Sequence, residues 1–282
     1  MCRTVQLPAV TGTVDDAAEN GDGASRGVRA QLILVAGASL ISVSLAAYEI
    51  GPASVTPLIR ETMGIDAGAA GLIVGAMFGA AVVASLPVGA VLDRTNSRIA
   101  VAVAVLTLFV AGLWGWVAAE GGSYLSLLAS RFVGGLAYVV VWNAGIDIVS
   151  EAVSADYRAT AVGVFTASGP VGFALGQGTG PVVAAQFGWP AIFPAFLAIA
   201  LVGLALFWPT SRGLGRVGDG SPPGLGDFGD VFRNRGVWLV AMLGFLGYSL
   251  YLFVNSWAPS YLTDEIGLSL AFSGIIAAAF PA

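Results

Sequence analysis

The sequence contains no histidine and no lysine, and its single cysteine, Cys2, lies near the N-terminus. Without histidine the chain cannot form an HExxH zinc site or a Ser-His-Asp triad. One cysteine cannot form a disulfide within the chain. We find no residue cluster that would support catalysis, so we expect a protein that is not an enzyme and that has no cofactor and no metal.

Charged residues are also scarce, at 10% of 282 residues, whereas a soluble domain carries about 25%. Hydrophobic residues make up 57%, and the mean hydropathy is +0.85. Burial in a bilayer explains this deficit, because a charge at mid-membrane costs about 2.5–3.5 kcal/mol on insertion scales. The composition predicts an all-α transmembrane helical bundle, since an open strand edge cannot lie in lipid.

Long apolar stretches alternate with short polar loops, and a membrane-spanning helix needs about 20 apolar residues. We expect seven such helices and the start of an eighth, over residues 31–58, 67–91, 98–119, 123–149, 159–185, 190–208, 236–260 and 269–282. Residues 1–30 are polar and acidic, which is typical of a disordered tail. The Gly/Pro-rich segment 209–235 predicts a linker between a six-helix half (31–208) and the beginning of a second half (236–282).

Arginine is distributed unequally between the two sides of this bundle. If the N-terminus is cytoplasmic, the outer loops hold only Arg60, and the inner segments hold Arg3, Arg26, Arg29, Arg94, Arg98, Arg158, Arg212, Arg216, Arg233 and Arg235. An excess of basic residues marks the cytoplasmic side. We therefore expect a multi-pass plasma-membrane protein with a cytoplasmic N-terminus, surrounded by lipid and with no nucleic-acid partner.

The loop after the second predicted helix reads GAVLDRTNSR, from Gly89 to Arg98. Together with six helices and a long inner loop, it resembles the signature G-x-L-a-D-R-x-G-R-[RK] of the major facilitator superfamily. The positions that match are Gly89, Asp93, Arg94 and Arg98. Asn96 replaces the usual glycine, and asparagine tolerates the positive φ of a tight turn better than most residues.

Ser97 replaces an arginine that, in the family, pairs with an acid at the inner end of helix 4. The resemblance therefore implies that Arg94 or Arg98 must reach Asp147 or Glu151 here. The alternative is an ordinary charged loop between two spans.

Helix 123–149 contains LLASRFVGG, which resembles the family's second motif, l-x-x-x-R-x-x-q-G, with Arg131 at the arginine position. This residue lies about 12 Å inside the span, where an arginine needs a partner or a wet cavity. We expect Arg131 to face a cavity and to hold an anionic group or tune Glu49. The alternative is a side chain that snorkels to the outer face.

Glu49, which follows Tyr48 in the first predicted helix, is an acid in an otherwise uncharged stretch. Loss of water favours the protonated form of a carboxyl group, and many proton-coupled members of the family place an acid near this point. We expect Glu49 to carry a coupling proton. The alternative is an acid close to the outer interface.

Other polar side chains in the predicted helices could line the same cavity, although each alone is more often a packing residue: Trp142, Asn143, Gln177, Tyr248, Tyr251 and Asn255. Two glycine strips also stand out. They have the i, i+4, i+8 spacing that lets helix backbones approach closely, and they comprise Gly71, Gly75 and Gly79, and Gly172, Gly176 and Gly180. In the family these helices face the opposite half, so the strips would form a moving interface; static packing is the alternative.

The resemblance covers residues 31–282 and implies a secondary transporter in which two halves rock around a central site. It implies a small-molecule substrate, an organic anion or a drug-like compound, moved with protons by a protein that is monomeric when full length. Family members usually have twelve helices, so we expect this chain to be a fragment or an inactive truncated product. A non-transporting assembly or sensor protein would share the same pattern of helices. An intramembrane enzyme would also share it but would need a catalytic cluster.

Overall fold

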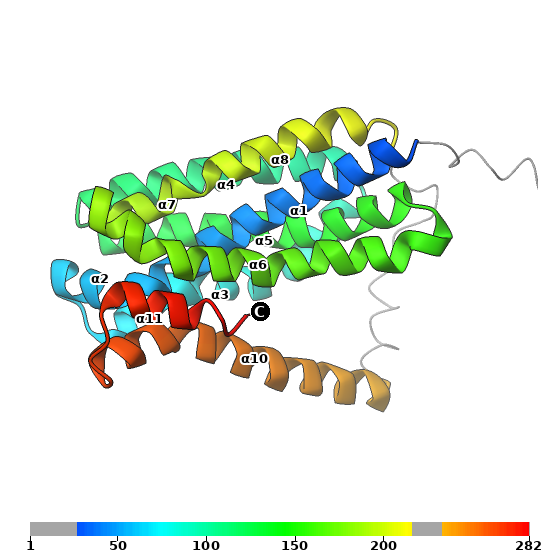
Figure 1. Ribbon diagram of the computed structural model, residues 1–282. Coiled ribbons are helices and arrows are strands. Elements are labelled where there is room, and N and C mark those ends of the chain that lie inside the picture. The colour runs from blue at the N-terminus through cyan, green and yellow to red at the C-terminus, as the bar shows by residue number, and fades with distance from the viewer. Residues whose placement is uncertain (1–26, 216–232, 282) are drawn as a thin grey trace, which may run out of the picture.

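The computed structural model describes residues 27–215 and 233–281, and these ranges contain helices and no strand (Figure 1). Most of the predicted tail and most of the predicted linker lie outside the described residues, and α1 begins three residues before the predicted helix start at 31. The helices are α1 (Val28–Ile50), η2 (Gly51–Val55), α2 (Thr56–Met63), α3 (Ala67–Leu92), α4 (Ser97–Glu120), α5 (Tyr124–Ala152), α6 (Ala155–Phe187), η3 (Trp189–Ala191), α7 (Ile192–Ala195), α8 (Leu197–Thr210), α10 (Arg235–Asp264) and α11 (Leu270–Ala277).

Seven stretches of the described chain are long and apolar enough to cross a membrane. The first combines α1, η2 and α2 into 36 residues, and the sixth combines η3, α7 and α8. The predicted all-α transmembrane bundle is confirmed. The orientation of its ends in the membrane stays a prediction.

Polar side chains fix where several helices begin. The Asp66 carboxylate accepts a hydrogen bond from the Ala69 amide at the start of α3. Asn96 does the same for the amides of Arg98 and Ile99 at the start of α4. Asn96 has φ −68°, so the expectation that it provides a positive φ is wrong. Its side chain instead caps the helix by satisfying amides that lack a helical partner.

The six spans from α1 to α8 pack into one body around α1. The helix α1 contacts α5, α6 and α8, and α5 contacts α3 and α4. Gly37 and Gly203 bring the backbones of α1 and α8 close together, since a Cβ atom at Gly37 would lie 2.8 Å from the Gly203 carbonyl oxygen. We call this unit, residues 28–210, the six-span body.

The helices α10 and α11 contact the six-span body mainly at one end. There α10 contacts η2 and α2, and α11 contacts α6 and η2 (Figure 1). Every residue of α10 from 235 to 250 is exposed, whereas burial begins at its other half. We call the closed end the α2 end and the opposite one the linker end. The bundle is thus closed at the α2 end, and α10 diverges toward the linker end.

Candidate substrate and coupling site

A cavity of about 420 Å³ lies where α10 faces the six-span body. Its walls come from α1, α5, α6 and α10, and its lining residues are Ala46, Glu49, Tyr138, Trp142, Thr166, Gly169, Pro170, Phe173, Tyr248 and Tyr251. The structure therefore brings together four residues that the sequence singled out, Glu49, Trp142, Tyr248 and Tyr251. We call it the central cavity.

Glu49 lies in the last turn of α1 and is 1% exposed. Neither of its carboxyl oxygens has a hydrogen-bond partner among the described residues. An ionised carboxylate in that position is costly unless a positive charge or a proton compensates it. Glu49 is thus a buried acid whose charge is available to a proton or to a solute.

Proline explains why α1 ends beside this acid. Pro52 has no N–H group, so the carbonyl of Tyr48, four residues earlier, loses its helical donor, and the chain continues as the 3₁₀ helix η2. The Arg131 guanidinium supplies the missing donors: its Nη1 donates to the Tyr48 carbonyl over 2.9 Å, and its Nη2 donates to the Glu49 carbonyl. Arg131 of α5 therefore stabilises the break in α1, which is the point where α1 ends and η2 begins.

Arg131 is completely buried and does not line the central cavity. Its Nε also donates to the Ile73 carbonyl of α3 over 2.8 Å, and its guanidinium carbon lies 4.5 Å from the centre of the Tyr48 ring. The expectation of a cavity-facing Arg131 is wrong, because backbone carbonyls occupy its donors. Nor does it snorkel to the surface. Its charge still lies close enough to the Glu49 carboxylate to interact with it.

Aromatic rings form much of the wall of the central cavity. Tyr138 of α5 and Tyr248 of α10 share a hydrogen bond between their hydroxyl oxygens, 3.1 Å apart. Phe173 of α6 stacks on Tyr251 of α10, with ring centroids 5.7 Å apart. Trp142 lies 6.1 Å from Tyr138, centroid to centroid, and its indole N–H has no partner in the described chain. The Tyr138–Tyr248 hydrogen bond and the Phe173–Tyr251 stack therefore join the six-span body to α10, the next span.

Four other predicted site residues lie outside this cavity. Gln177 of α6 donates to the side-chain oxygen of Asn255 of α10 over 3.1 Å, which makes a second contact between the six-span body and α10. The Gln177 side-chain oxygen itself has no partner among the described residues. Asn143 donates to the Val139 carbonyl of its own helix. Tyr48, completely buried, packs its ring against Arg131.

The signature loop at the linker end makes contacts that differ from the expected ones. The guanidinium carbon of Arg98 lies 3.6 Å from the centre of the Trp208 ring, and the same side chain donates a hydrogen bond to the Trp208 carbonyl. Glu151 accepts a hydrogen bond from the Gly215 amide over 2.7 Å. Within residues 27–215 and 233–281, neither Arg94 nor Arg98 forms an ion pair with Asp147 or Glu151. The expected pairing is therefore not present in this conformation. Glu151 instead accepts its hydrogen bond from the backbone of the turn after α8.

Other signature residues lie near the same loop. Asp93 is the residue that follows the end of α3, and its charge is close enough to that of Asp147 to interact. A Cβ atom at Gly89 would have no neighbour within 4 Å. The role of these residues in gating stays a prediction.

The two glycine strips have different surroundings. Gly172, Gly176 and Gly180 pack against α1 and η2, inside the six-span body: a Cβ atom at Gly172 would lie 2.5 Å from the Val43 carbonyl oxygen, and one at Gly180 would overlap Ser54. For this strip the expected interface with the opposite half is wrong, because its open side is filled by the helix α1. Only Gly71 of the other strip meets α10, where Trp257 covers it.

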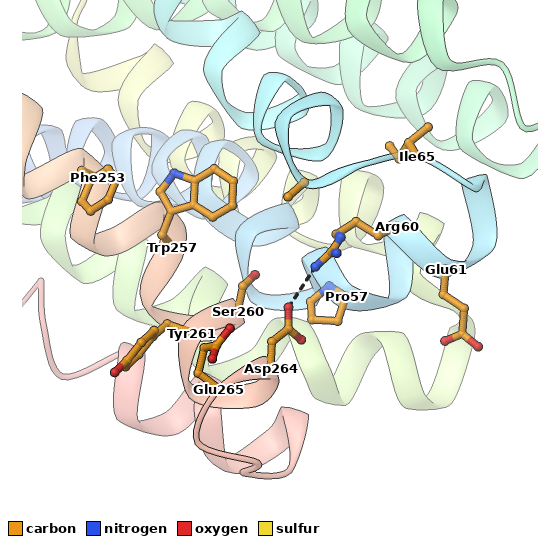
Figure 2. A pocket seen from close by; sticks show the side chains of 11 residues that line it. Pro57, Arg60, Glu61, Ile65, Phe253, Trp257, Ser260, Tyr261, Asp264 and Glu265 are labelled. Atoms are coloured by element: carbon orange, nitrogen blue, oxygen red, sulfur yellow. Dashed lines mark hydrogen bonds and ion pairs between the residues drawn. The ribbon is translucent and has the colours of Figure 1, made fainter.

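A second cavity, of about 860 Å³, lies at the surface of the α2 end, between α2 and α10 (Figure 2). Arg60 and Asp264 point toward each other across it, with Nη1 and Oδ2 2.9 Å apart, and Glu61, Glu265 and Trp257 also line it. The sequence identifies Arg60 only as an outer charge. The opposite charges are visible in the sequence, but their meeting depends on how α10 packs.

Comparison with known proteins adds the family. The sequence profile of the Major Facilitator Superfamily matches residues 32–282. A probable L-galactonate transporter of Escherichia coli (strain K12) is 26% identical over 244 residues, covering 78% of this chain and 51% of the relative. A probable nitrate/nitrite antiporter, NarK1 of Thermus thermophilus, is 28% identical over 205 residues, covering 68% and 45%.

Solved structures share the fold. A bacterial homolog of the human lysosomal transporter Spinster, in an inward-facing and unoccupied conformation, superposes with a TM-score of 0.71 at 19% sequence identity, covering 92% of this chain and 60% of that one. This chain spans about half the length of the curated relatives it matches.

Proposed function

The chain belongs to the Major Facilitator Superfamily, and we propose that it is part of a secondary transporter that moves a small solute by alternating access, with Glu49 as the proton-carrying group. Support comes from the arrangement of the six-span body and α10, which touch at the α2 end and diverge toward the linker end. A cavity at the junction of the six-span body and α10 is where a transporter that works by alternating access binds its solute. The central cavity would hold the solute.

The single observation that carries the coupling proposal is the environment of Glu49. Its carboxyl group is buried, lies in the wall of the central cavity, and lacks a hydrogen-bond partner in the described chain. An ionisable group inside a membrane protein is costly and is commonly part of an ion or proton path. A proton that binds to Glu49 at one side and leaves at the other would couple solute movement to the proton gradient.

Both curated relatives above are named for anions, L-galactonate and nitrate or nitrite. In this chain, a cavity-facing Arg131 would favour an anionic substrate. That guanidinium is occupied by carbonyl oxygens instead, so it gives no support to an anionic substrate.

The proposal is tested with the purified protein in proteoliposomes that contain a pH-sensitive dye. A panel of sugar acids, inorganic anions, amines and drug-like compounds is added outside, and proton movement is recorded for wild type, Glu49→Gln and Glu120→Gln. Glu120 is an exposed acid at the end of α4, so it is the matched control. We expect solute-driven proton movement in wild type and in Glu120→Gln, and none in Glu49→Gln.

Chemical labelling gives a second readout that needs no known substrate. Dicyclohexylcarbodiimide modifies carboxyl groups that are protonated in apolar surroundings, so mass spectrometry should find Glu49 modified and Glu120 unmodified. Proton movement that persists in Glu49→Gln would exclude Glu49 as the coupling group. A protein that binds solutes of the panel but moves none of them would fit a sensor instead of a transporter.

A further inference from the structure

The charge on the wall of the central cavity is of one sign. Glu49 is the sole charged residue among the described residues that line it. Its carboxylate is close enough to the hydroxyl groups of Tyr138, Tyr248 and Tyr251 to act on them electrostatically. Arg131 is not in this wall, and its donors point to carbonyls of α1 and α3. A solute in the cavity therefore meets an acid in the wall, while the charge of Arg131, which partly offsets that of Glu49, lies outside the lining.

The rest of the wall suits a positive charge with an apolar body. Five aromatic side chains line the cavity: Tyr138, Trp142, Phe173, Tyr248 and Tyr251. The face of an aromatic ring is negative and attracts cations, most strongly where water is excluded. The same rings repel an anion and offer it no donor except hydroxyl groups and the indole N–H of Trp142.

The cavity at the α2 end also has more negative than positive charge in its lining. Its lining holds three acids, Glu61, Asp264 and Glu265, and one base, Arg60, which is already paired with Asp264. Clefts lined by charge of one sign raise the local concentration of the opposite charge. A cation approaching from that side is attracted, and an anion is repelled.

We infer that the central cavity recognises an organic cation with an aromatic or apolar body, through the ring faces of its wall and the carboxylate of Glu49, which has no hydrogen-bond partner in the described chain. This inference rests on the transport function proposed above, and it specifies the substrate class. The carboxyl oxygens of Glu49 are themselves buried in this conformation, so the attraction acts through the field of the charge rather than through a hydrogen bond. An organic cation and a proton would then neutralise the same group in turn.

Two probes of the same shape and opposite charge test the inference. Tetraphenylphosphonium and tetraphenylborate each carry four phenyl rings around one charged atom. Binding of each, radiolabelled, is measured by equilibrium dialysis against the purified protein in detergent, with empty detergent micelles as the blank. We expect saturable binding of the phosphonium and none of the borate above the blank.

Variants separate the charge from the rings. Tyr248 is 45% exposed, so shortening it removes a ring without opening a core. We expect Glu49→Gln to weaken phosphonium binding by about tenfold and Tyr248→Leu by about two- to thirtyfold, the range of a cation–π contact. Glu120→Gln, at an exposed position outside the cavity, should bind like wild type. Gel filtration and circular dichroism check that each variant is folded.

Two results would overturn the inference: borate binding as tight as phosphonium binding, or Glu49→Gln binding the phosphonium like wild type. Either could occur while Glu49→Gln still abolishes proton movement with another solute, and the proposed function would then stand. Conversely, a protein that binds the phosphonium through Glu49 but moves no proton with any solute would contradict the function and leave the cation site in place.

Discussion

Arg60 of α2 and Asp264, the last residue of α10, form an ion pair across the α2 end, with 2.9 Å between Nη1 and Oδ2 (Figure 2). The pair joins the six-span body to the next span over 204 positions of sequence. Beside it, Trp257 of α10 packs on Gly71 of α3. These contacts close the end of the bundle opposite to the one where α10 is exposed.

This ion pair should favour the conformation that is closed at the α2 end, because opening that end must separate its partners. Both side chains are more than one third exposed, 38% and 36%, and an exposed pair contributes about 0.2–1 kcal/mol. Arg60→Gln should therefore shift the population toward the open form by up to about fivefold. High salt should produce a similar, smaller shift through screening.

The measurement is a distance distribution between spin labels at Glu61→Cys and Glu265→Cys, in a Cys2→Ser background. We expect a longer-distance population to grow in Arg60→Gln and in Asp264→Asn. The exchanged pair, Arg60→Asp with Asp264→Arg, should return the distribution toward wild type. Distributions that do not change in the single variants would show that Trp257 and its neighbours close this end without the ion pair.

Much of the fold could be predicted from the sequence, because lipid imposes one rule on every span. A stretch such as 98–119 is too long and too apolar to be anything but a helix in a bilayer, and α4 spans Ser97–Glu120. Tertiary context then sets the ends. The predicted helix 159–185 extends to Ala155–Phe187, since polar residues continue a helix beyond the apolar part that reveals it.

The direction in which side chains point was less predictable. The sequence placed Glu49 and Arg131 deep in two helices, and both are buried there. It could not reveal that the arginine faces the carbonyls freed by Pro52, because that requires the relative rotation of α1 and α5. The prediction for the glycine strip of α6 was wrong for the same reason, because spacing identifies a smooth helix face but not the helix that packs on it.

The packing of Gly172 gives a stability prediction with a control inside the same class of residue. A methyl group at Gly172 would lie 2.5 Å from the Val43 carbonyl oxygen and 2.6 Å from the Ala46 Cβ, whereas Gly79 has no neighbour within 4 Å of that position. Gly172→Ala should destabilise the protein by about 1–3 kcal/mol through overpacking. Gly79→Ala should cost nothing. The readout is the apparent Tm in detergent, and equal Tm values for the two variants would contradict static packing of this strip.

The position of Arg131 leads to the strongest stability prediction. Its guanidinium holds three carbonyl oxygens on α1 and α3 from a completely buried site. A lysine ammonium is a single point and cannot reproduce this fork. Arg131→Lys should therefore leave carbonyls unsatisfied and destabilise the protein by about 2–4 kcal/mol. Arg158→Lys, at an exposed position of α6, is the matched control and should keep the wild-type Tm.

A double-mutant cycle with Pro52 distinguishes this structural role from substrate binding. Pro52→Ala restores an N–H group four residues after Tyr48, so the Tyr48 carbonyl regains a helical donor and depends less on Arg131. The loss of Tm caused by Arg131→Lys should then be smaller in the Pro52→Ala background than in wild type, which is a coupling between neighbouring sites. If Arg131→Lys instead keeps its Tm and loses only solute binding, the arginine acts on the substrate. Additive losses would mean that Arg131 stabilises the bundle independently of the break in α1.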